Sequence, residues 1–317
     1  ASDQSLYNYK GYGTLTAHGA ALENISIAAL ALGYKPTIDL FPSDDAPEHI
    51  ANIRLGTKGE PDREIEGLYR AIANRSTNRK PYGKLALKQS SSTHMDQSGR
   101  KYLPEVRYER VSDLSDIRKL SRVASTNEEI MLGNRHLHSF FFSHLSWTQE
   151  EDARKKIGFY IKTLELPAPV QAMFRVISHW QIMRFLKLAG FPSLVGKGNA
   201  DTYARSSEIG IIHINHPDRK SYVSAGRLLE RLWLTATAEG ISFQPLTGTI
   251  FMNLYAEHDE NHSFFSQSER MLLAQSVSTI SDVSKLSNTT PVLMFRMGYA
   301  QPPTARALRY ALDELMV

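Results

Sequence analysis

The chain carries one segment twice, and this repeat limits the folds that it can adopt. Residues 19–34 read GAALENISIAALALGY, and residues 226–241 read GRLLERLWLTATAEGI. Without gaps the copies share six identities: Gly19/Gly226, Leu22/Leu229, Glu23/Glu230, Ala29/Ala236, Ala31/Ala238 and Gly33/Gly240. The offset of 226 − 19 = 207 residues far exceeds the roughly 20–50 residues of a solenoid unit. The repeat therefore indicates a duplicated domain, or a homodimer whose two halves became one chain.

Both copies predict buried helices. In the first copy only Glu23, Asn24 and Ser26 interrupt an apolar segment without a polar face. A helix that is apolar all round lies in a protein interior. The glycine near the end of each copy, Gly33 or Gly240, suits the position that follows a helix. We therefore expect two helices at the centre of the molecule, packed against each other.

Composition narrows the class of protein. The chain has 317 residues, enough for one large domain or two, with 42% apolar and 22% charged residues. Its net charge of +4 suits anionic small ligands, and no basic run interleaves with aromatics, so we expect no nucleic-acid partner. Cysteine is absent, which excludes disulfides and thiol catalysis. The polar N-terminus and the lack of a long apolar run predict a cytoplasmic protein without a membrane partner.

The order of predicted elements is typical of an α+β fold. After the first repeat we expect a strand over 37–41, a helix over 63–73, a mobile serine-rich loop over 89–100 and a strand over 105–111. Residues 113–190 are expected to be mainly helical, and strands are expected over 207–215 and 291–297. The regular strand–helix alternation of a doubly wound fold is missing.

A short basic turn is the first candidate site. Arg75, Ser76, Thr77 and Arg79 place two guanidiniums and two hydroxyls directly after the helix that ends at residue 73. Arginine forms bidentate, charge-assisted bonds to phosphate, and hydroxyls add donors. Taken alone, the cluster is more typical of a solvated basic turn.

Two further segments are compatible with the same ligand. Gln244, Pro245, Leu246, Thr247 and Gly248 follow the second repeat and its short strand, where Pro and Gly let a backbone approach a flat ligand. Near the C-terminus, Arg296, Arg306 and Arg309 are candidates to complete an anion site. An ordinary turn and a basic surface helix are the simpler interpretations of each segment.

No motif of another cofactor or metal class is complete. His258 and His262 have a metal-compatible spacing, but the surrounding EHDENH reads more simply as a hydrated acidic loop, so we expect no metal. The Walker, HExxH and GxSxG patterns are absent.

Together these segments resemble the FMN-dependent nitroreductase family, and most closely its tandem single-chain, Acg-like subgroup. The R-x-S-x-R/K turn of that family is matched by Arg75, Thr77 and Arg79, with Thr in place of Ser. The A-x-G-L end of its buried helix and the following P-x-E-G segment are matched by residues 238–241 and 245–248, with Thr247 in place of Glu. Its closing strand and P-x-x-R segment are matched by residues 296–299 and 303–306.

The resemblance implies a nitroreductase-like fold that forms a single-chain pseudo-dimer. Residues 1–60 would be part of a first half, and residues 61–317 the FMN-binding half. A second arginine turn would fall at 75 − 207 = −132, so the first copy is shortened or the chain lacks an N-terminal part. The N-x-Q-P-W segment of the family is absent. One FMN per chain is expected, in a monomer or a homodimer.

The resemblance also implies an activity. Two electrons would pass from NAD(P)H through FMN to a small-molecule acceptor such as a nitroaromatic or a quinone. Arg227, Arg231 or Arg79 would stabilise reduced flavin, unless Arg227 and Arg231 pair with Glu23 or Glu230 instead. Two alternatives stay open: a protein that binds and sequesters FMN with little turnover, and a flavin dehydrogenase module of a larger protein.

Overall fold

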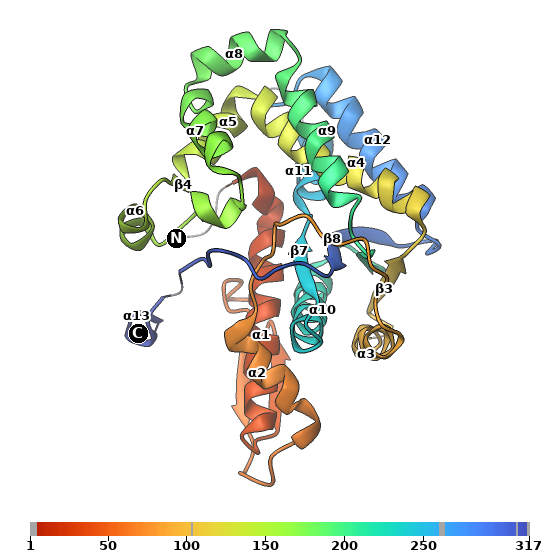
Figure 1. Cartoon of the computed structure of the whole chain (residues 1–317). Coiled ribbons are helices and arrows are strands. Elements are labelled where there is room, and N and C mark those ends of the chain that lie inside the picture. Colours follow the sequence, from red (N-terminus) through yellow and green to blue (C-terminus); the bar gives the residue numbers. More distant parts are fainter. Residues whose placement is uncertain (1–4, 103, 260–263, 309, 316–317) are drawn as a thin grey trace.

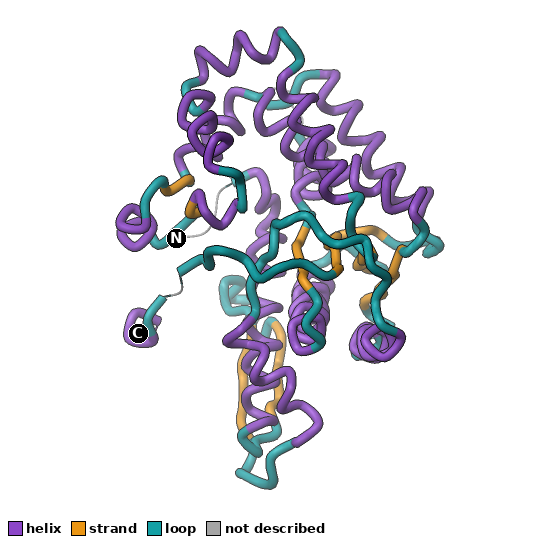
Figure 2. The backbone as a smooth tube through the Cα atoms, in the orientation of Figure 1, coloured by secondary structure: helices purple, strands orange, loops and turns teal. Residues whose placement is uncertain are grey.

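A four-stranded antiparallel sheet forms the centre of the molecule. The computed structural model describes residues 5–102, 104–259, 264–308 and 310–315. The strand order is β3-β6-β8-β7, with bounds Val106–Val111, Glu208–Ile214, Thr290–Gly298 and Ser242–Pro245. All three pairings are antiparallel. The sheet lies among many helices (Figures 1 and 2), so the expected α+β class is confirmed.

Helices cover both faces of this sheet. Every residue of β6 is buried, as expected for a strand covered on both sides. Its Ile209 and Ile211 pack with α4 (Leu114–Gly133), α11 (Gly248–His258) and α12 (Gln267–Val283), while Ile212 and Ile214 pack with α10 (Arg219–Ala238). Figure 1 shows α4, α12 and α9 (Phe191–Tyr203) above the sheet, and α10 with α1 (Tyr12–Ala31) below it.

The two repeat helices, α1 and α10, pack against each other, as the repeat predicts. Their repeated glycines mark the contact: a Cβ atom on Gly19 would lie 2.1 Å from the Val223 carbonyl oxygen. A Cβ on Gly226 would lie 2.0 Å from that of Thr16. Each helix therefore needs a glycine where the other backbone passes.

Both repeat helices also end in the same way. Gly33 has a φ of +87° and Gly240 a φ of +69°. The Gly33 and Tyr34 amides donate to Leu30 and Ala29, and the Gly240 and Ile241 amides donate to Thr237 and Ala236. This is the same six-residue Schellman closure in both copies. The predicted C-terminal glycines are thus confirmed.

The remaining elements lie around this centre. The N-terminal part holds η1 (Leu6–Gly11), the hairpin β1–β2 (Pro36–Leu40 and Ala51–Leu55), η2 (Arg63–Ile65) and α2 (Glu66–Asn74). The expected helical block contains α5, α6, η3, α7 and α8, with bounds Arg135–Ser143, Gln149–Lys155, Ile161–Leu164, Ala168–Ile177 and Trp180–Leu188. Within it the two-residue strands β4 (Leu145–Ser146) and β5 (Phe159–Tyr160) pair in parallel. The described residues after β8 form the C-terminal segment, which includes a short helix, α13 (Leu312–Leu315).

The predicted mobile loop over residues 89–100 is wrong, because these residues form a helix, α3 (Gln89–Gly99). Ser91, Ser92 and Met95 are buried although serine favours helices only weakly. The Ser91 hydroxyl donates to Glu239, and the Ser98 hydroxyl lies 2.7 Å from that of Thr235, so α10 and the residue directly after it satisfy these two hydroxyls. Packing against α10 thus outweighs the local preference.

Among the described residues, no helix is long and apolar enough to cross a membrane.

Candidate functional site

A pocket of about 370 Å³ lies between the basic turn and the C-terminal segment. Three stretches of the chain line it: the end of α2 with the turn that follows, the region of β5 and η3, and the segment before α13. The described lining residues are Ala73, Arg75, Ser76, Thr77, Arg79, Gly158, Phe159, Thr163, Ala305, Arg306, Ala307 and Leu308. Three are arginines, two of the polar ones are adjacent hydroxyls, and none is acidic. This lining favours an anionic ligand.

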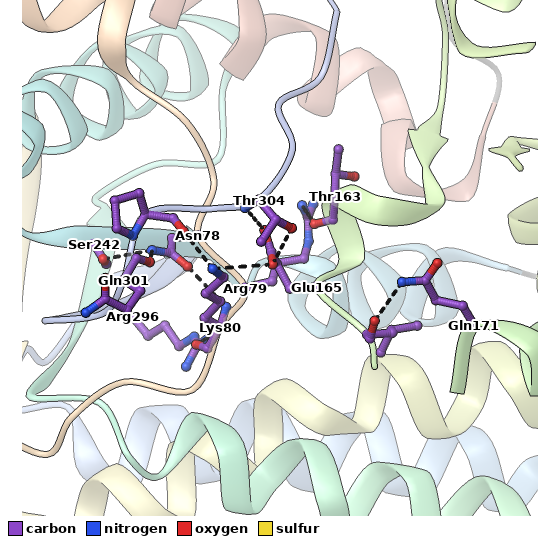
Figure 3. Close-up of polar contacts among 12 residues, drawn as sticks. Asn78, Arg79, Lys80, Thr163, Glu165, Gln171, Ser242, Arg296, Gln301 and Thr304 are labelled. Atoms are coloured by element: carbon purple, nitrogen blue, oxygen red, sulfur yellow. Dashed lines mark hydrogen bonds and ion pairs between the residues drawn. The ribbon is translucent and has the colours of Figure 1, made fainter. Parts of the chain in front are cut away.

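The turn leaves α2 in a defined direction because a buried asparagine holds it. Asn78 is 4% exposed, and its amide N–H donates to the Phe243 carbonyl at 3.0 Å. Its side chain donates to Ser242 Oγ and to the Gln301 carbonyl, and accepts from the Lys80 amide in an Asx turn (Figure 3). The turn is therefore fixed both to β7 and to the C-terminal segment.

The three arginines of the pocket differ in their surroundings. Arg75 Nε lies 2.9 Å from Glu230 Oε1, and its guanidinium covers the Trp233 ring at 4.3 Å. Arg79 donates to the Thr163 carbonyl at 3.0 Å, and its guanidinium lies 5.4 Å from the Phe159 ring. Arg306 is exposed and forms no ion pair with a residue that the structure describes.

Burial acts on the charge of Arg79. Desolvation lowers the pKa of its guanidinium, and the neighbouring Tyr203 and Glu128 partly offset this effect. Burial in turn raises the pKa of the Glu128 carboxyl, which accepts hydrogen bonds from Tyr203 and Asn127. Arginine stays charged despite such shifts. An anion in the pocket would therefore stabilise a cation that is only partly solvated.

The segment of residues 244–248 lies near the turn but does not line the pocket. Gln244 and Pro245 end β7, Leu246 is buried, Thr247 precedes α11, and Gly248 begins that helix. Gln244 Oε1 accepts from Arg296 Nε at 2.8 Å. A Cβ on Gly248 would lie 2.1 Å from Asn127 Oδ1, so the glycine permits a close approach of α11 to α4.

Of the other expected arginines, Arg227, Arg231 and Arg296 do not line the pocket, and Arg309 falls outside the described residues. Arg231 Nε lies 2.7 Å from Glu23 Oε1, and Arg227 Nε lies 3.2 Å from Glu23 Oε2. Glu23 is fully buried, so both cations lie at the contact between α1 and α10. Arg227 and Arg231 therefore pair with Glu23, which is the alternative to a role in stabilising reduced flavin.

A metal site is not evident in the part of the chain that the structure describes. His262 lies outside that part, and His258 Nδ1 contacts the Leu254 carbonyl at 2.9 Å.

Comparison with known proteins gives matches among solved structures alone. No family model matches the chain, and no curated protein matches it. It is similar to the FMN-dependent nitroreductase NfnB from Mycobacterium smegmatis in complex with NADPH, at 12% identity and a TM-score of 0.45, over 80% of this chain and 98% of that one.

Two other matches are of the same kind. A nitroreductase with bound FMN from Bacteroides fragilis matches at 10% identity and a TM-score of 0.40, over 79% of this chain and 96% of that one. The NADPH:FMN oxidoreductase from Vibrio harveyi complexed with NAD+ matches at 11% identity and a TM-score of 0.39, over 79% and 76%. At these TM-scores the family of this chain, and its tandem subgroup, stay proposals.

Four residues near the pocket were missed in the sequence: Asn78, Phe159, Thr163 and Glu165. Asn78 lies inside the basic turn, and asparagine often closes a turn through its own side chain, so its position was a usable signal. The other three belong to a short stretch of the helical block without a motif of its own. Only tertiary contact brings that stretch to the pocket.

Proposed function

We propose that the pocket binds the phosphate end of FMN, and that the chain is an FMN-dependent oxidoreductase of the nitroreductase type. The observation that carries the proposal is the convergence of the Arg75–Arg79 turn with Arg306 in one pocket. The resemblance assigns both segments to one phosphate, although they lie at opposite ends of the FMN-binding half. A solvated turn and a basic surface helix have no reason to meet.

The residues present fit such a ligand. Arg79 and Arg306 would hold the phosphate, with the Ser76 and Thr77 hydroxyls as further donors. Arg75 would act mainly through its charge, because its Nε already pairs with Glu230. Phe159 and Leu308 supply apolar surface beside the cations. Gln244–Gly248 are kept as proposed contacts of the flavin ring and Arg309 as a further phosphate contact, whereas Arg231 is not, because it pairs with Glu23.

The chemistry belongs to the cofactor. Bound FMN would accept a hydride from NAD(P)H and give two electrons to a small-molecule acceptor, a nitroaromatic or a quinone. The protein would orient the ring and keep the phosphate in place. The positive lining would also favour the anionic phosphate over the neutral riboflavin chain.

The test compares FMN with riboflavin, which lacks the phosphate. We expect Arg306→Ala to weaken FMN binding by about 1.5–3 kcal/mol, roughly 10- to 150-fold, because a charge-assisted bond is lost. Riboflavin binding should stay unchanged. Arg184→Ala, an exposed arginine on α8, is the matched control. Equal FMN affinity of the two variants would refute the phosphate site.

A second measurement separates turnover from storage. NADPH added to the FMN-loaded protein should bleach the flavin absorbance, and an acceptor should restore it. Tight FMN binding without bleaching by NADPH, but with bleaching by dithionite, would favour the sequestering alternative. Reduction only in the presence of a fused or partner enzyme would favour the dehydrogenase module.

A further inference from the structure

We propose that Glu165 is a positioning residue that holds the C-terminal segment across the pocket, so that Arg306 faces the bound phosphate. The proposal rests on the proposed FMN site. Glu165 itself does not line the pocket. It would act through Thr304, two residues before Arg306.

Both carboxylate oxygens of Glu165 accept hydrogen bonds from Thr304. The Thr304 amide N–H donates to Oε1 at 2.6 Å, and the Thr304 hydroxyl donates to Oε2 at 2.8 Å (Figure 3). Lys80 Nζ lies 3.9 Å from Oε2 and donates to the Pro302 carbonyl at 2.7 Å. The side chain of Glu165 is only 4% exposed. A buried carboxylate with three such partners fixes the segment from 302 to 304.

The short stretch that contains Glu165 also contacts the basic turn on the other side of the pocket. Residues 161–164 form η3, and the Thr163 carbonyl accepts from Arg79. Glu165, two residues after Thr163, accepts hydrogen bonds from Thr304. The stretch 163–165 therefore connects the basic turn to the C-terminal segment, and these are the two parts that carry the pocket's arginines.

The backbone of Glu165 supports a specific role. Its φ of +57° and ψ of +29° lie in the left-handed region, which is unfavourable for a residue other than glycine. Glycine would adopt this conformation at little cost, yet glutamate occupies it. The contacts of the carboxylate with Thr304 and Lys80 give a reason for the side chain at this position.

The negative charge of Glu165 argues against direct contact with an anionic ligand. A carboxylate beside a phosphate is repulsive, whereas here Lys80 and the Thr304 donors balance it. Burial lowers the pKa of Arg79, and Glu165 is one of the groups that oppose this decrease, so its charge also supports that arginine. We assign its further effect on an anion to the placement of Arg306. A merely structural residue would affect all ligands of the pocket alike.

The main test variant is Glu165→Gly, which removes the carboxylate and keeps the left-handed backbone accessible. In the protein without flavin, hydrogen exchange of a peptide over residues 299–308 should rise about tenfold, because the Thr304 amide loses its acceptor. FMN affinity should fall about tenfold, and riboflavin affinity should stay unchanged. Thr304→Val, which keeps the amide and removes the hydroxyl, should show a smaller change in the same direction.

Glu314→Gln is the matched control. It removes another ion pair of the C-terminal segment, with Lys156 of the helical block, beyond Arg306. We expect the FMN to riboflavin preference of this variant to equal that of the wild type.

Three outcomes would overturn the proposal. Unchanged exchange in Glu165→Gly would show that the carboxylate does not hold the segment. Faster exchange with an unchanged ratio of FMN to riboflavin affinity would show that the position of Arg306 does not depend on Glu165. Equal loss of both flavins would assign Glu165 a general structural role. Wild-type protein that binds FMN no better than riboflavin would refute the phosphate site itself, and exchange would still decide whether Glu165 holds the segment.

Discussion

At the scale of single residues, Arg296 was expected to help complete an anion site, but its side chain connects structural elements instead. Its side chain is fully buried on β8, 3.9 Å from the Tyr82 ring and 5.1 Å from the Tyr203 ring. It donates to Gln244 Oε1 at 2.8 Å and to the Lys80 carbonyl at 2.9 Å. Arg296 therefore does not line the pocket. It connects β7 to the residue that follows the basic turn.

His213 on β6 allows a prediction about pH. It is 1% exposed, with Ser284 Oγ at 3.2 Å from Nε2 and Thr289 Oγ1 at 3.2 Å from Nδ1. Burial lowers the pKa of His213 to about 4, although Glu109 acts in the opposite direction and Arg107 adds to the decrease. The unfolded chain takes up a proton near pH 6.5, whereas the folded chain does so only near pH 4.

Stability should therefore fall as pH drops from about 6.5 to about 4, by up to roughly 3 kcal/mol from this residue. The measurement is urea unfolding across this range for the wild type and His213→Gln, which should show a shallower pH dependence. His18→Gln, at an exposed histidine, serves as control. Parallel curves for the wild type and His213→Gln would contradict the assignment.

At the scale of elements, sequence periodicity succeeded where burial and local preference agree. The strands near 105–111, 207–215 and 291–297 appear within a residue of the expected bounds, and both repeat helices end as expected but begin seven residues before the repeat, at Tyr12 and Arg219. The sequence predictions failed where contacts with residues distant in the chain determine the local structure. Helix α3 depends on polar contacts with α10, and Arg231 pairs with a glutamate 208 positions away.

The candidate site divides in the same way. Residue chemistry and the family resemblance indicated the turn of Arg75–Arg79 and Arg306, which the structure places in one pocket. Glu165 was missed because its left-handed backbone and its contact with Thr304 leave no mark in the sequence around it. No local pattern links residues 165 and 304.

The crossing of α1 and α10 gives a prediction for the repeated glycines. We expect Gly19→Ala or Gly226→Ala to lower the free energy of unfolding by about 3 kcal/mol, because each new Cβ would meet backbone of the other helix. Gly198→Ala in α9 is the control: nothing lies within 4 Å of its Cβ, so a gain of about 0.5–1 kcal/mol is expected. Chemical denaturation measures all three. Equal stability of Gly226→Ala and Gly198→Ala would exclude close helix contact.

At the scale of the whole molecule, the N-terminal part and the remainder share one interior. Leu15 and Leu22 belong to the same core cluster as Leu228 and Trp233. Glu23, fully buried, pairs with Arg227 and Arg231 and accepts a hydrogen bond from Tyr102. The core therefore crosses the boundary expected near residue 60.

Separate expression of residues 1–60 and 61–317 tests this shared interior. The larger fragment alone should lack a cooperative unfolding transition, because the face of α10 that meets α1 would be exposed and Arg227 and Arg231 would lose Glu23. Adding the smaller fragment should restore the transition, as followed by circular dichroism. Glu23→Gln in the smaller fragment should weaken reassembly by about 3 kcal/mol, because a buried charge pair is broken. Glu60→Gln, at an exposed position, should reassemble like the wild type. A larger fragment that unfolds cooperatively by itself would show that residues 61–317 build their own complete core.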